Sequence, residues 1–379
     1  MFIHASLSSI FYWKFPNGMN HRLTLIALAF VGLVLTGQGC VSLSGNKGTG
    51  TSGPAGVFVS EDQGETWKQS SQLPTVEGVK TLSQVSVYRL TNDPNDSKAF
   101  YWLSRANGLL YTYDNGKSWR TVEGKLKTGF IRAVAVHPKD PCTLVASTGT
   151  EVYRSDDCSR SWKEIYRESR PNVPINSLAF NPFEVYEIFI GEGNGDLLKS
   201  ADQGVSWSVV NRFRNGISQV ELDPNEEGIL YVATRKLGLF KSDDGGTTWA
   251  SLKETMEDFP NADEFRRFAL HPTQSHILYW ISTYGILISE DEGTTWSPIE
   301  LITPPGSAQI YGFAVNPNNE EELYYTATIN SRSTFYKSID GGKRWVTKRL
   351  PSGQLPTALR VHPDDGNIIY IGFTIPPSQ

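Results

Sequence analysis

The sequence predicts an all-β protein, a seven-bladed β-propeller of four-stranded antiparallel blades. Two repeated phrases predict this fold: an eight-residue phrase ending in Trp that occurs seven times, and a shorter apolar run that ends in Asn, His or Asp followed by Pro. By subtraction of their positions, the seven tryptophans are 52, 43, 45, 42, 47 and 49 residues apart. One four-stranded blade needs a spacing of about this size, so we predict a single propeller domain over residues 56–379.

The Trp phrase is predicted to be a hairpin turn. Each copy follows an alternating apolar run and precedes a second short run, which is the pattern of a β-hairpin. Its third-position Asp can accept hydrogen bonds from the backbone N–H groups of the turn, and its fifth-position Gly supplies a positive φ. The seven aspartates are Asp62, Asp114, Asp157, Asp202, Asp244, Asp291 and Asp340. We expect the closing Trp to pack against the neighbouring repeat.

These aspartates have a second interpretation, as catalytic carboxylates or metal ligands. A calcium loop of the EF-hand type needs oxygen ligands at alternate positions and a distal Glu within about 12 residues, and no copy provides them. We therefore assign a structural role and predict no metal, no cofactor and no catalytic residue here. Ser159 replaces the Gly of the third copy and Arg344 replaces the Ser or Thr of the seventh, so we expect these two turns to be the least regular.

The Trp phrase resembles the Asp-box, or BNR repeat, of sialidases, sortilin (VPS10-like) receptors, xyloglucan hydrolases and photosystem II stability/assembly factors. The resemblance covers nearly all of residues 56–379 and implies a propeller fold. Because the Asp-box is structural in all these families, it implies no particular activity.

The Pro phrase is predicted to form the first hairpin turn of each blade, because Pro fixes φ and ends strand pairing. His137, His271 and His362 precede Pro in three different repeats. A metal triad is one interpretation of these histidines, but their shared turn position favours a structural role. The chain begins with an Asp-box and ends with a Pro turn, so residues 56–69 should supply the outer two strands, and residues 357–374 the inner two, of one shared closing blade.

Residues 1–39 are predicted to be a signal peptide, with Met19 as a possible true start. The apolar run 23–35 is shorter than the ~20 residues that span a bilayer. The run LTGQGC resembles a bacterial lipobox and implies lipidation of Cys40, although Leu35 lies five residues before Cys40 instead of three. Cleaved secretion and a retained anchor are the alternatives. Residues 40–55 read as a flexible tether, and we expect an exported protein that is lipid-anchored in the cell envelope, on its periplasmic or extracellular face.

The two remaining cysteines, Cys142 and Cys158, fall in the same predicted blade. Antiparallel pairing of strands two and three brings them to one end of the blade, and an exported protein permits a disulfide. We predict that they are bonded; the alternative is two unrelated thiols.

Functional residues are expected at the blade end that carries the connections between strands two and three and between blades. The long connection 250–264 has five carboxylates, which are either solvated or a source of a general acid/base pair. Many cations gather at the same end, and they predict a positive face for an acidic protein surface or an anionic glycan. The candidate binding residues are Arg132, Arg167, Arg170, Arg212, Arg214, Arg235, Arg266 and Arg267. The formal net charge of −5 gives no indication of nucleic-acid binding.

Among the families named, the sequence has no FRIP-type run of the sialidases. It has neither the second propeller of the xyloglucan hydrolases nor the ten blades and cysteine-rich module of the sortilin receptors. The resemblance to photosystem II assembly factors implies a non-catalytic, monomeric scaffold that binds a membrane or envelope protein. A carbohydrate-binding or glycoside-hydrolase-like protein of the sialidase or xyloglucanase type is the alternative.

Overall fold

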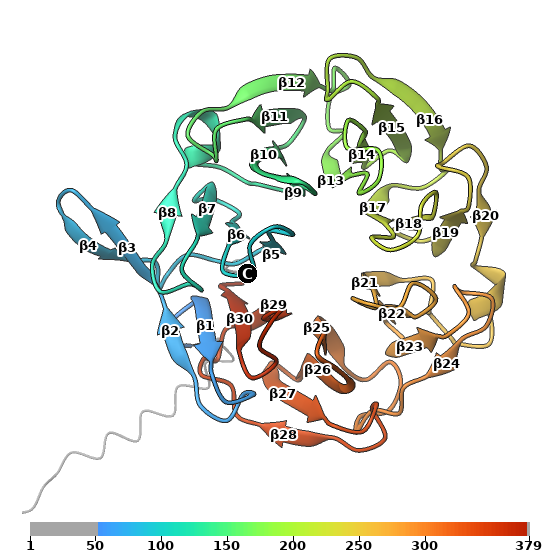
Figure 1. Cartoon of the computed structure of the whole chain (residues 1–379). Coiled ribbons are helices and arrows are strands. Elements are labelled where there is room, and N and C mark those ends of the chain that lie inside the picture. Colours follow the sequence, from blue (N-terminus) through green and yellow to red (C-terminus); the bar gives the residue numbers. More distant parts are fainter. Residues whose placement is uncertain (1–51, 377–379) are drawn as a thin grey trace, which may run out of the picture. The chain divides into compact units, whose positions relative to one another are not determined.

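Seven four-stranded antiparallel sheets surround a central channel (Figure 1). The structure is a computed structural model that describes residues 52–376. The predicted signal peptide, Cys40 and residues 40–51 of the predicted tether lie outside the described residues. None of the helices in residues 52–376 has the length and hydropathy of a membrane-spanning segment.

Each blade is a meander whose strands are hydrogen-bonded in order. Blades 1 to 3 consist of β5 (Arg89–Asn92), β6 (Phe100–Leu103), β7 (Leu109–Thr112) and β8 (Arg120–Thr121); β9 (Ala133–His137), β10 (Asp140–Ser147), β11 (Glu151–Ser155) and β12 (Lys163–Arg167); and β13 (Ile175–Phe180), β14 (Ile188–Glu192), β15 (Asp196–Ser200) and β16 (Ser208–Arg212). Blades 4 to 6 consist of β17 (Ile217–Leu222), β18 (Leu230–Thr234), β19 (Leu239–Ser242) and β20 (Ala250–Ser251); β21 (Phe265–Leu270), β22 (Leu278–Ser282), β23 (Ile286–Ser289) and β24 (Ser297–Pro298); and β25 (Gln309–Asn316), β26 (Asn319–Ile329), β27 (Arg332–Ser338) and β28 (Val346–Lys348).

The closing blade joins the two ends of the described chain. It has the strand order β2-β1-β30-β29 and combines β1 (Gly56–Ser60) and β2 (Lys68–Ser70) with β29 (Leu355–Val361) and β30 (Ile369–Thr374). Antiparallel pairing runs from Gly56 opposite Phe373 to Ser60 opposite Ile369. The predicted seven-bladed fold with a shared closing blade is confirmed.

Hydrophobic side chains fill the spaces between neighbouring blades. The seven buried apolar clusters in residues 52–376 each combine residues of two neighbouring blades. For example, Tyr101 and Leu103 of blade 1 pack with Val134 and Leu144 of blade 2. The first strand of every blade is therefore held from both sides, and the side chains that it directs toward the channel have fixed positions.

The Asp-box turns form as the sequence predicts. In blade 4, the Ser242 hydroxyl donates to Asp244 Oδ1 over 2.9 Å, and that oxygen also accepts the Thr248 N–H over 2.8 Å. The Thr248 hydroxyl donates to Asp244 Oδ2 over 2.7 Å. These bonds to Thr248 and Ser242 stabilise the ionised carboxylate and lower the pKa of Asp244 to about 2. Both carboxylate oxygens of Asp244 accept hydrogen bonds within its own turn, which supports a structural role for this aspartate.

The expectation that the third and seventh turns are the least regular is wrong. Ser159 has a φ of 70°, close to the 76° to 93° of the glycines at the same position, and its N–H still donates to the Ser155 hydroxyl over 2.9 Å. In the seventh turn, Arg344 Nε donates to Asp340 Oδ2 over 2.7 Å in place of the usual hydroxyl. The backbone bonds to Asp set the turn, so it tolerates a change at either position.

The Asp-box tryptophans contact the preceding blade, as expected. The Trp207 indole N–H donates to the Ile165 carbonyl over 3.2 Å, and the Trp345 indole N–H donates to the Glu300 carbonyl over 2.8 Å. Each repeat is thereby attached to its neighbour.

The Pro turns also repeat one geometry. Asp223 Oδ1 accepts the Asn225 N–H over 2.8 Å, and His362 Nδ1 accepts the Asp364 N–H over 3.1 Å in the same way. The histidines that precede Pro belong to three separate blades. Within residues 52–376, no group of three or more His, Cys, Asp or Glu side chains is arranged to hold a metal ion.

Three connections contain structure that the repeats do not predict. A hairpin of β3 (Gln72–Thr75) and β4 (Gly78–Thr81) projects from the connection between the closing blade and blade 1 (Figure 1). Two short 3-10 helices, η1 (Gly124–Lys127) and η2 (Glu254–Met256), lie in later connections.

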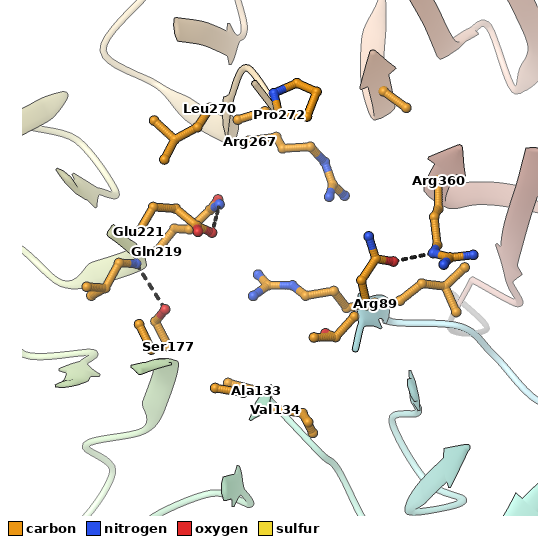
Figure 2. Close-up of a pocket in the computed structure, with 18 of the residues that line it drawn as sticks. Arg89, Ala133, Val134, Ser177, Gln219, Glu221, Arg267, Leu270, Pro272 and Arg360 are labelled. Atoms are coloured by element: carbon orange, nitrogen blue, oxygen red, sulfur yellow. Dashed lines mark hydrogen bonds between the residues drawn. The ribbon is translucent and has the colours of Figure 1, made fainter. Parts of the chain in front are cut away.

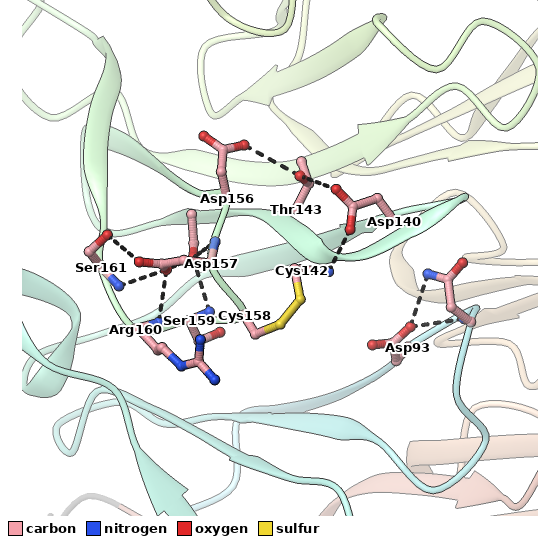
Figure 3. The surroundings of a disulfide bond; sticks show 12 residues. Asp93, Asp140, Cys142, Thr143, Asp156, Asp157, Cys158, Ser159, Arg160 and Ser161 are labelled. Atoms are coloured by element: carbon pink, nitrogen blue, oxygen red, sulfur yellow. Dashed lines mark hydrogen bonds between the residues drawn. A yellow bond between two sulfur atoms is a disulfide. The ribbon is translucent and has the colours of Figure 1, made fainter.

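Cys142 and Cys158 form a disulfide in blade 2 (Figure 3). Cys142 lies in β10, and Cys158 is the fourth residue of the Asp-box turn after β11. The Cys158 N–H also donates to the Cys142 carbonyl over 3.1 Å. The bond therefore attaches the one Asp-box that lacks its glycine to the neighbouring strand.

Candidate functional site

The first strands of all seven blades line a central cavity of about 580 Å³. Its wall is mostly apolar, with side chains such as Ala133, Leu178 and Val220. Its polar side chains include Arg89 on β5, Gln219 and Glu221 on β17, Arg267 on β21 and Arg360 on β29 (Figure 2). Groups that can bind a polar ligand therefore face a channel whose other lining residues are mostly apolar.

These side chains have few partners of their own. Glu221 accepts a hydrogen bond from Gln219 Nε2 over 2.7 Å. Arg267 Nη2 donates to the Tyr311 carbonyl over 3.0 Å and to the Thr357 carbonyl over 3.2 Å. No ion pair within 4.0 Å joins Glu221 to either arginine in the described part of the chain.

Burial shifts the protonation equilibria in the channel. Burial raises the pKa of the Glu221 carboxyl, while the Gln219 hydrogen bond and the positive charge of Arg89 partly offset this rise. Burial, with repulsion from Arg89, lowers the pKa of Arg267 to about 10. The channel thus has a guanidinium group, that of Arg267, whose pKa is lowered and a carboxyl group, that of Glu221, whose pKa is raised.

A second cavity, of about 750 Å³, opens at the blade end that carries the inter-blade connections; we call it the mouth. Arg89 and Arg267 line both cavities, so the mouth and the channel meet at these residues. The mouth has aromatic rings and planar polar groups, among them Gln84, Tyr88, Arg105, Asn107, Phe265, Arg266 and Tyr311. The Arg105 guanidinium lies 5.0 Å from the Tyr88 ring centre and 5.3 Å from that of Phe130, which holds these groups together.

A third cavity, of about 400 Å³, lies in the long connection 250–264; we call it the loop pocket. Glu257 and Asp263 both line it, with Phe259 and Asn261. The Lys253 ammonium lies 3.7 Å from Asp263 Oδ2. Only Glu264 separates Asp263 from Phe265, the first mouth residue of β21.

The predicted positive face is broken up by carboxylates. Arg170 forms ion pairs of 2.6, 2.7 and 2.8 Å with Glu168, Glu192 and Asp196, and Arg167 pairs with Glu151 and Glu164 at 2.5 and 2.6 Å. Glu164 and Glu168 are neighbours of these arginines along the chain, whereas Glu151, Glu192 and Asp196 come from other strands, and the sequence pattern of the arginines alone could not show these three.

The other predicted arginines are placed differently. Arg132 is half-buried over the Phe130 ring, and Arg212 lies 3.5 Å from Asp196. Arg214 and Arg235 are exposed. Of the eight, Arg266 and Arg267 lie at the mouth, and Arg267 also reaches the channel; a binding role for the set stays a prediction.

Sequence reasoning missed Arg89, Gln219 and Glu221. A usable signal exists, because Arg89 and Arg267 each lie five residues before the Pro of their turn, and Glu221 lies three before it. The residues three and five positions before the Pro of these turns lie on the part of the first strand that lines the channel.

The fold, the seven Asp-box turns and the closing blade define the chain as a seven-bladed Asp-box β-propeller. Comparison with known proteins agrees with this class. The model of the Sortilin-Vps10 family (sortilin, neurotensin receptor 3) matches residues 55–186. A xyloglucanase of Paenibacillus sp is 26% identical over 312 residues, which cover 71% of this chain and 29% of that protein.

Solved structures show the same fold. The GH74 xyloglucanase from Xanthomonas campestris superposes with a TM-score of 0.63 and 19% identity, covering 76% of this chain and 51% of that one. YCF48 bound to D1 peptide gives a TM-score of 0.58 and 16% identity, covering 85% of this chain and 100% of that one. This chain therefore spans less than a third of the Paenibacillus enzyme and about half of the Xanthomonas one.

The sequence similarity to a xyloglucanase contradicts two predictions from the sequence, the non-catalytic scaffold and the absence of enzymatic activity. It favours the carbohydrate-active alternative. The Xanthomonas structure and YCF48, at 19% and 16% identity, indicate the fold alone.

Proposed function

We propose that this propeller is carbohydrate-active, binding a polysaccharide of the xyloglucan type at the mouth and cleaving it by glycoside hydrolysis. The similarity to a xyloglucanase over 71% of the chain carries the proposal. Since the relatives are longer, their activity is proposed here for this propeller alone.

The mouth has the chemistry that recognises a neutral sugar chain. The C–H faces of a sugar ring pack on aromatic side chains such as Tyr88 and Tyr311, and hydroxyl groups bond to planar donors and acceptors such as Asn107. A cavity of about 750 Å³ is within the range of small-ligand sites.

The loop pocket supplies the two carboxyl groups that glycoside hydrolysis needs. Asp263 lies near the Lys253 ammonium, so we assign the anionic role to Asp263 and the acid role to Glu257, the other carboxyl group that lines the pocket. Glu257 gives its proton to the glycosidic oxygen as the bond from the anomeric carbon to that oxygen breaks. Asp263 takes a proton from the water whose oxygen bonds to the anomeric carbon.

We further propose that the chain is exported and anchored through Cys40. Two observations support export: the predicted signal peptide and the Cys142–Cys158 disulfide, a bond typical of oxidising compartments. Metabolic labelling with a fatty-acid analogue, in the wild type and in Cys40→Ser, tests the anchor. Unlabelled wild-type protein would exclude it.

The function is tested on the full chain with soluble xyloglucan and, for comparison, unsubstituted cello-oligosaccharides. We expect xyloglucan binding in calorimetry, together with new reducing ends. Glu257→Gln and Asp263→Asn should each lower the hydrolysis rate by about 100-fold or more and keep binding, whereas Tyr88→Ala should weaken binding. Glu254→Gln is the matched control, since Glu254 is in the same connection but does not line the pocket.

Binding without hydrolysis would overturn the catalytic roles of Glu257 and Asp263 and leave a glycan-binding propeller. Absence of both binding and hydrolysis would overturn the proposed function.

A further inference from the structure

We propose that the central channel holds one carboxylate-bearing sugar unit, a uronic acid, between Arg89 and Arg267. The inference rests on the proposed function, because it takes the ligand of the channel to be part of a glycan. It adds an acidic sugar to the substrate class that the similarity to xyloglucanases indicates.

The charges of the channel favour an anion. Three guanidinium groups and one carboxyl group, those of Arg89, Arg267, Arg360 and Glu221, belong to residues that line the cavity. Arg360 is only 6% exposed, and its guanidinium bonds to the Asn92 side chain and the Ser97 carbonyl, so it is covered by its own blade and by blade 1. Arg89 and Arg267 therefore remain for a ligand.

The donors of these two arginines are available and positioned. Within residues 52–376, the Arg89 side chain makes neither a hydrogen bond nor an ion pair, and its guanidinium lies 5.7 Å from the centre of the Tyr88 ring. Arg267 is oriented by two backbone carbonyls through Nε and Nη2, which leaves Nη1 without a bond to the protein. A carboxylate between them would receive charge-assisted hydrogen bonds from donors that are partly oriented beforehand.

The opposite wall suits the hydroxyl groups of a sugar. Gln219 is fixed, since it donates to Glu221 and to the Phe268 carbonyl and accepts the Phe268 N–H over 3.3 Å. Its hydrogen bond uses Glu221 Oε1, so Oε2 is free to accept from a ligand hydroxyl. Figure 2 shows Glu221 and Gln219 across the channel from Arg89.

The charge of the lining favours an anion whether or not Glu221 is ionised. Arg89, Arg267, Arg360 and an ionised Glu221 sum to two positive charges, and a protonated Glu221 leaves three. The hydroxyl-binding groups of Gln219 and Glu221 on the opposite wall favour a carboxylate-bearing sugar over a bare anion such as phosphate. Because the mouth meets the channel at Arg89 and Arg267, a sugar chain lying in the mouth can place one acidic unit at this depth.

The test is calorimetric titration of the full chain at low salt with three probes: D-glucuronate, D-glucose and acetate. We expect D-glucuronate to bind at least about tenfold more tightly than either D-glucose or acetate, since neither offers both the carboxylate and the hydroxyls. Arg89→Gln should remove this preference. Arg160→Gln is the matched control, because it makes the same charge change on an exposed side chain of an Asp-box turn at the other blade end.

If Arg89→Gln fails to fold, Glu221→Gln replaces it. This variant removes the repelling carboxyl group and should bind D-glucuronate more tightly at pH 8. Equal affinity for D-glucuronate and D-glucose, or a preference that survives Arg89→Gln, would overturn the inference. Acetate binding as tightly as D-glucuronate would reduce the site to a general anion site and also overturn it.

The outcomes separate this inference from the proposed function. A protein that binds and cleaves neutral xyloglucan but does not prefer D-glucuronate retains the function and loses the channel site. A protein that binds D-glucuronate through Arg89 but neither binds nor cleaves xyloglucan retains the channel site and loses the function.

Discussion

Arg170 donates to Glu192 across 2.7 Å, and that carboxyl group is completely buried at the junction of blades 2 and 3. Glu168 shares the same guanidinium at 2.6 Å. Burial raises the pKa of Glu192 from 4.5 to about 7, whereas hydrogen bonds from Arg170 lower the pKa of Glu168 from 4.5 to about 2. Two carboxyl groups that bond to one guanidinium therefore have pKa values shifted in opposite directions.

This pair predicts how stability depends on pH. The folded protein holds the Glu192 proton more tightly than the unfolded chain does, so the stabilisation from Glu192 is present below about pH 4.5 and is lost as pH rises toward 7. Glu192→Gln should abolish this loss. We expect the variant to be more stable than wild type at pH 8, by up to about 3 kcal/mol, and similar to it at pH 5.

Urea unfolding at the two pH values measures this difference. Glu168→Gln is the control with the opposite sign, because Glu168 stabilises the fold above about pH 4.5 and loses this effect toward pH 2. If Glu192→Gln lost as much stability at pH 8 as at pH 5, the carboxyl would be ionised in its ion pair and the predicted sign would be wrong.

The repeats also predict which Asp-box glycines can be replaced. A Cβ on Gly204 would lie 2.6 Å from Ile165 Cδ1, at a φ of 91°. Gly204→Ser should therefore lower the free energy of unfolding by about 2 kcal/mol, through strain and crowding. Ser159→Gly, at the same position of the preceding blade, should change it by less than about 1 kcal/mol, because its backbone is already accommodated.

Denaturant unfolding of the two variants makes the comparison. Similar losses in both would mean that every Asp-box position responds alike and that contact with the neighbouring blade is unimportant.

The sequence predicts those features of the fold that depend on short repeated phrases. Asp244 bonds within its own turn, so a short phrase is enough to define it. The closing blade followed from the order of the two phrases. Arg170 was named as a binding residue, but its partners Glu192 and Asp196 lie more than 20 residues away along the chain.

The residues that line the channel could not be predicted from local sequence either. Glu221 and Arg267 come from the neighbouring blades 4 and 5, whereas Arg89 comes from blade 1. Only closure of the ring directs all three side chains to one cavity. Alternation along β17 places residues on the two faces of a strand, but it does not show which face meets the channel. The hairpin β3–β4 was missed because it interrupts a connection and repeats nowhere else in residues 52–376.

The disulfide should contribute measurably to stability. Its cysteines are 16 residues apart, and closing a loop of this size restricts the unfolded chain by about 3 kcal/mol. The double variant Cys142→Ser/Cys158→Ser should lose stability of this order and should no longer respond to reductant. An unchanged unfolding midpoint would show that the bond to the Asp-box turn is not needed to hold that turn.

The last prediction concerns the pH dependence of binding in the channel. The charged groups that line the channel are Glu221 on β17, Arg89 on β5, Arg267 on β21 and Arg360 on β29. Burial lowers the pKa of Arg267 and that of Arg360 to about 10, so these two guanidinium groups stay charged between pH 5 and 8. Glu221, whose pKa is raised by burial, is the group among them that gains its proton as pH falls.

An ionised Glu221 repels the carboxylate of a uronic acid, whereas a protonated one can donate a hydrogen bond to it. Wild-type affinity for D-glucuronate should therefore rise as pH falls from 8 to 5, and Glu221→Gln should bind with nearly constant affinity over that range. Calorimetric titration at each pH compares the two proteins. If the affinity of both proteins changed equally with pH, the titrating group would be one other than Glu221. The proposed contact of Glu221 with the bound sugar would then be wrong.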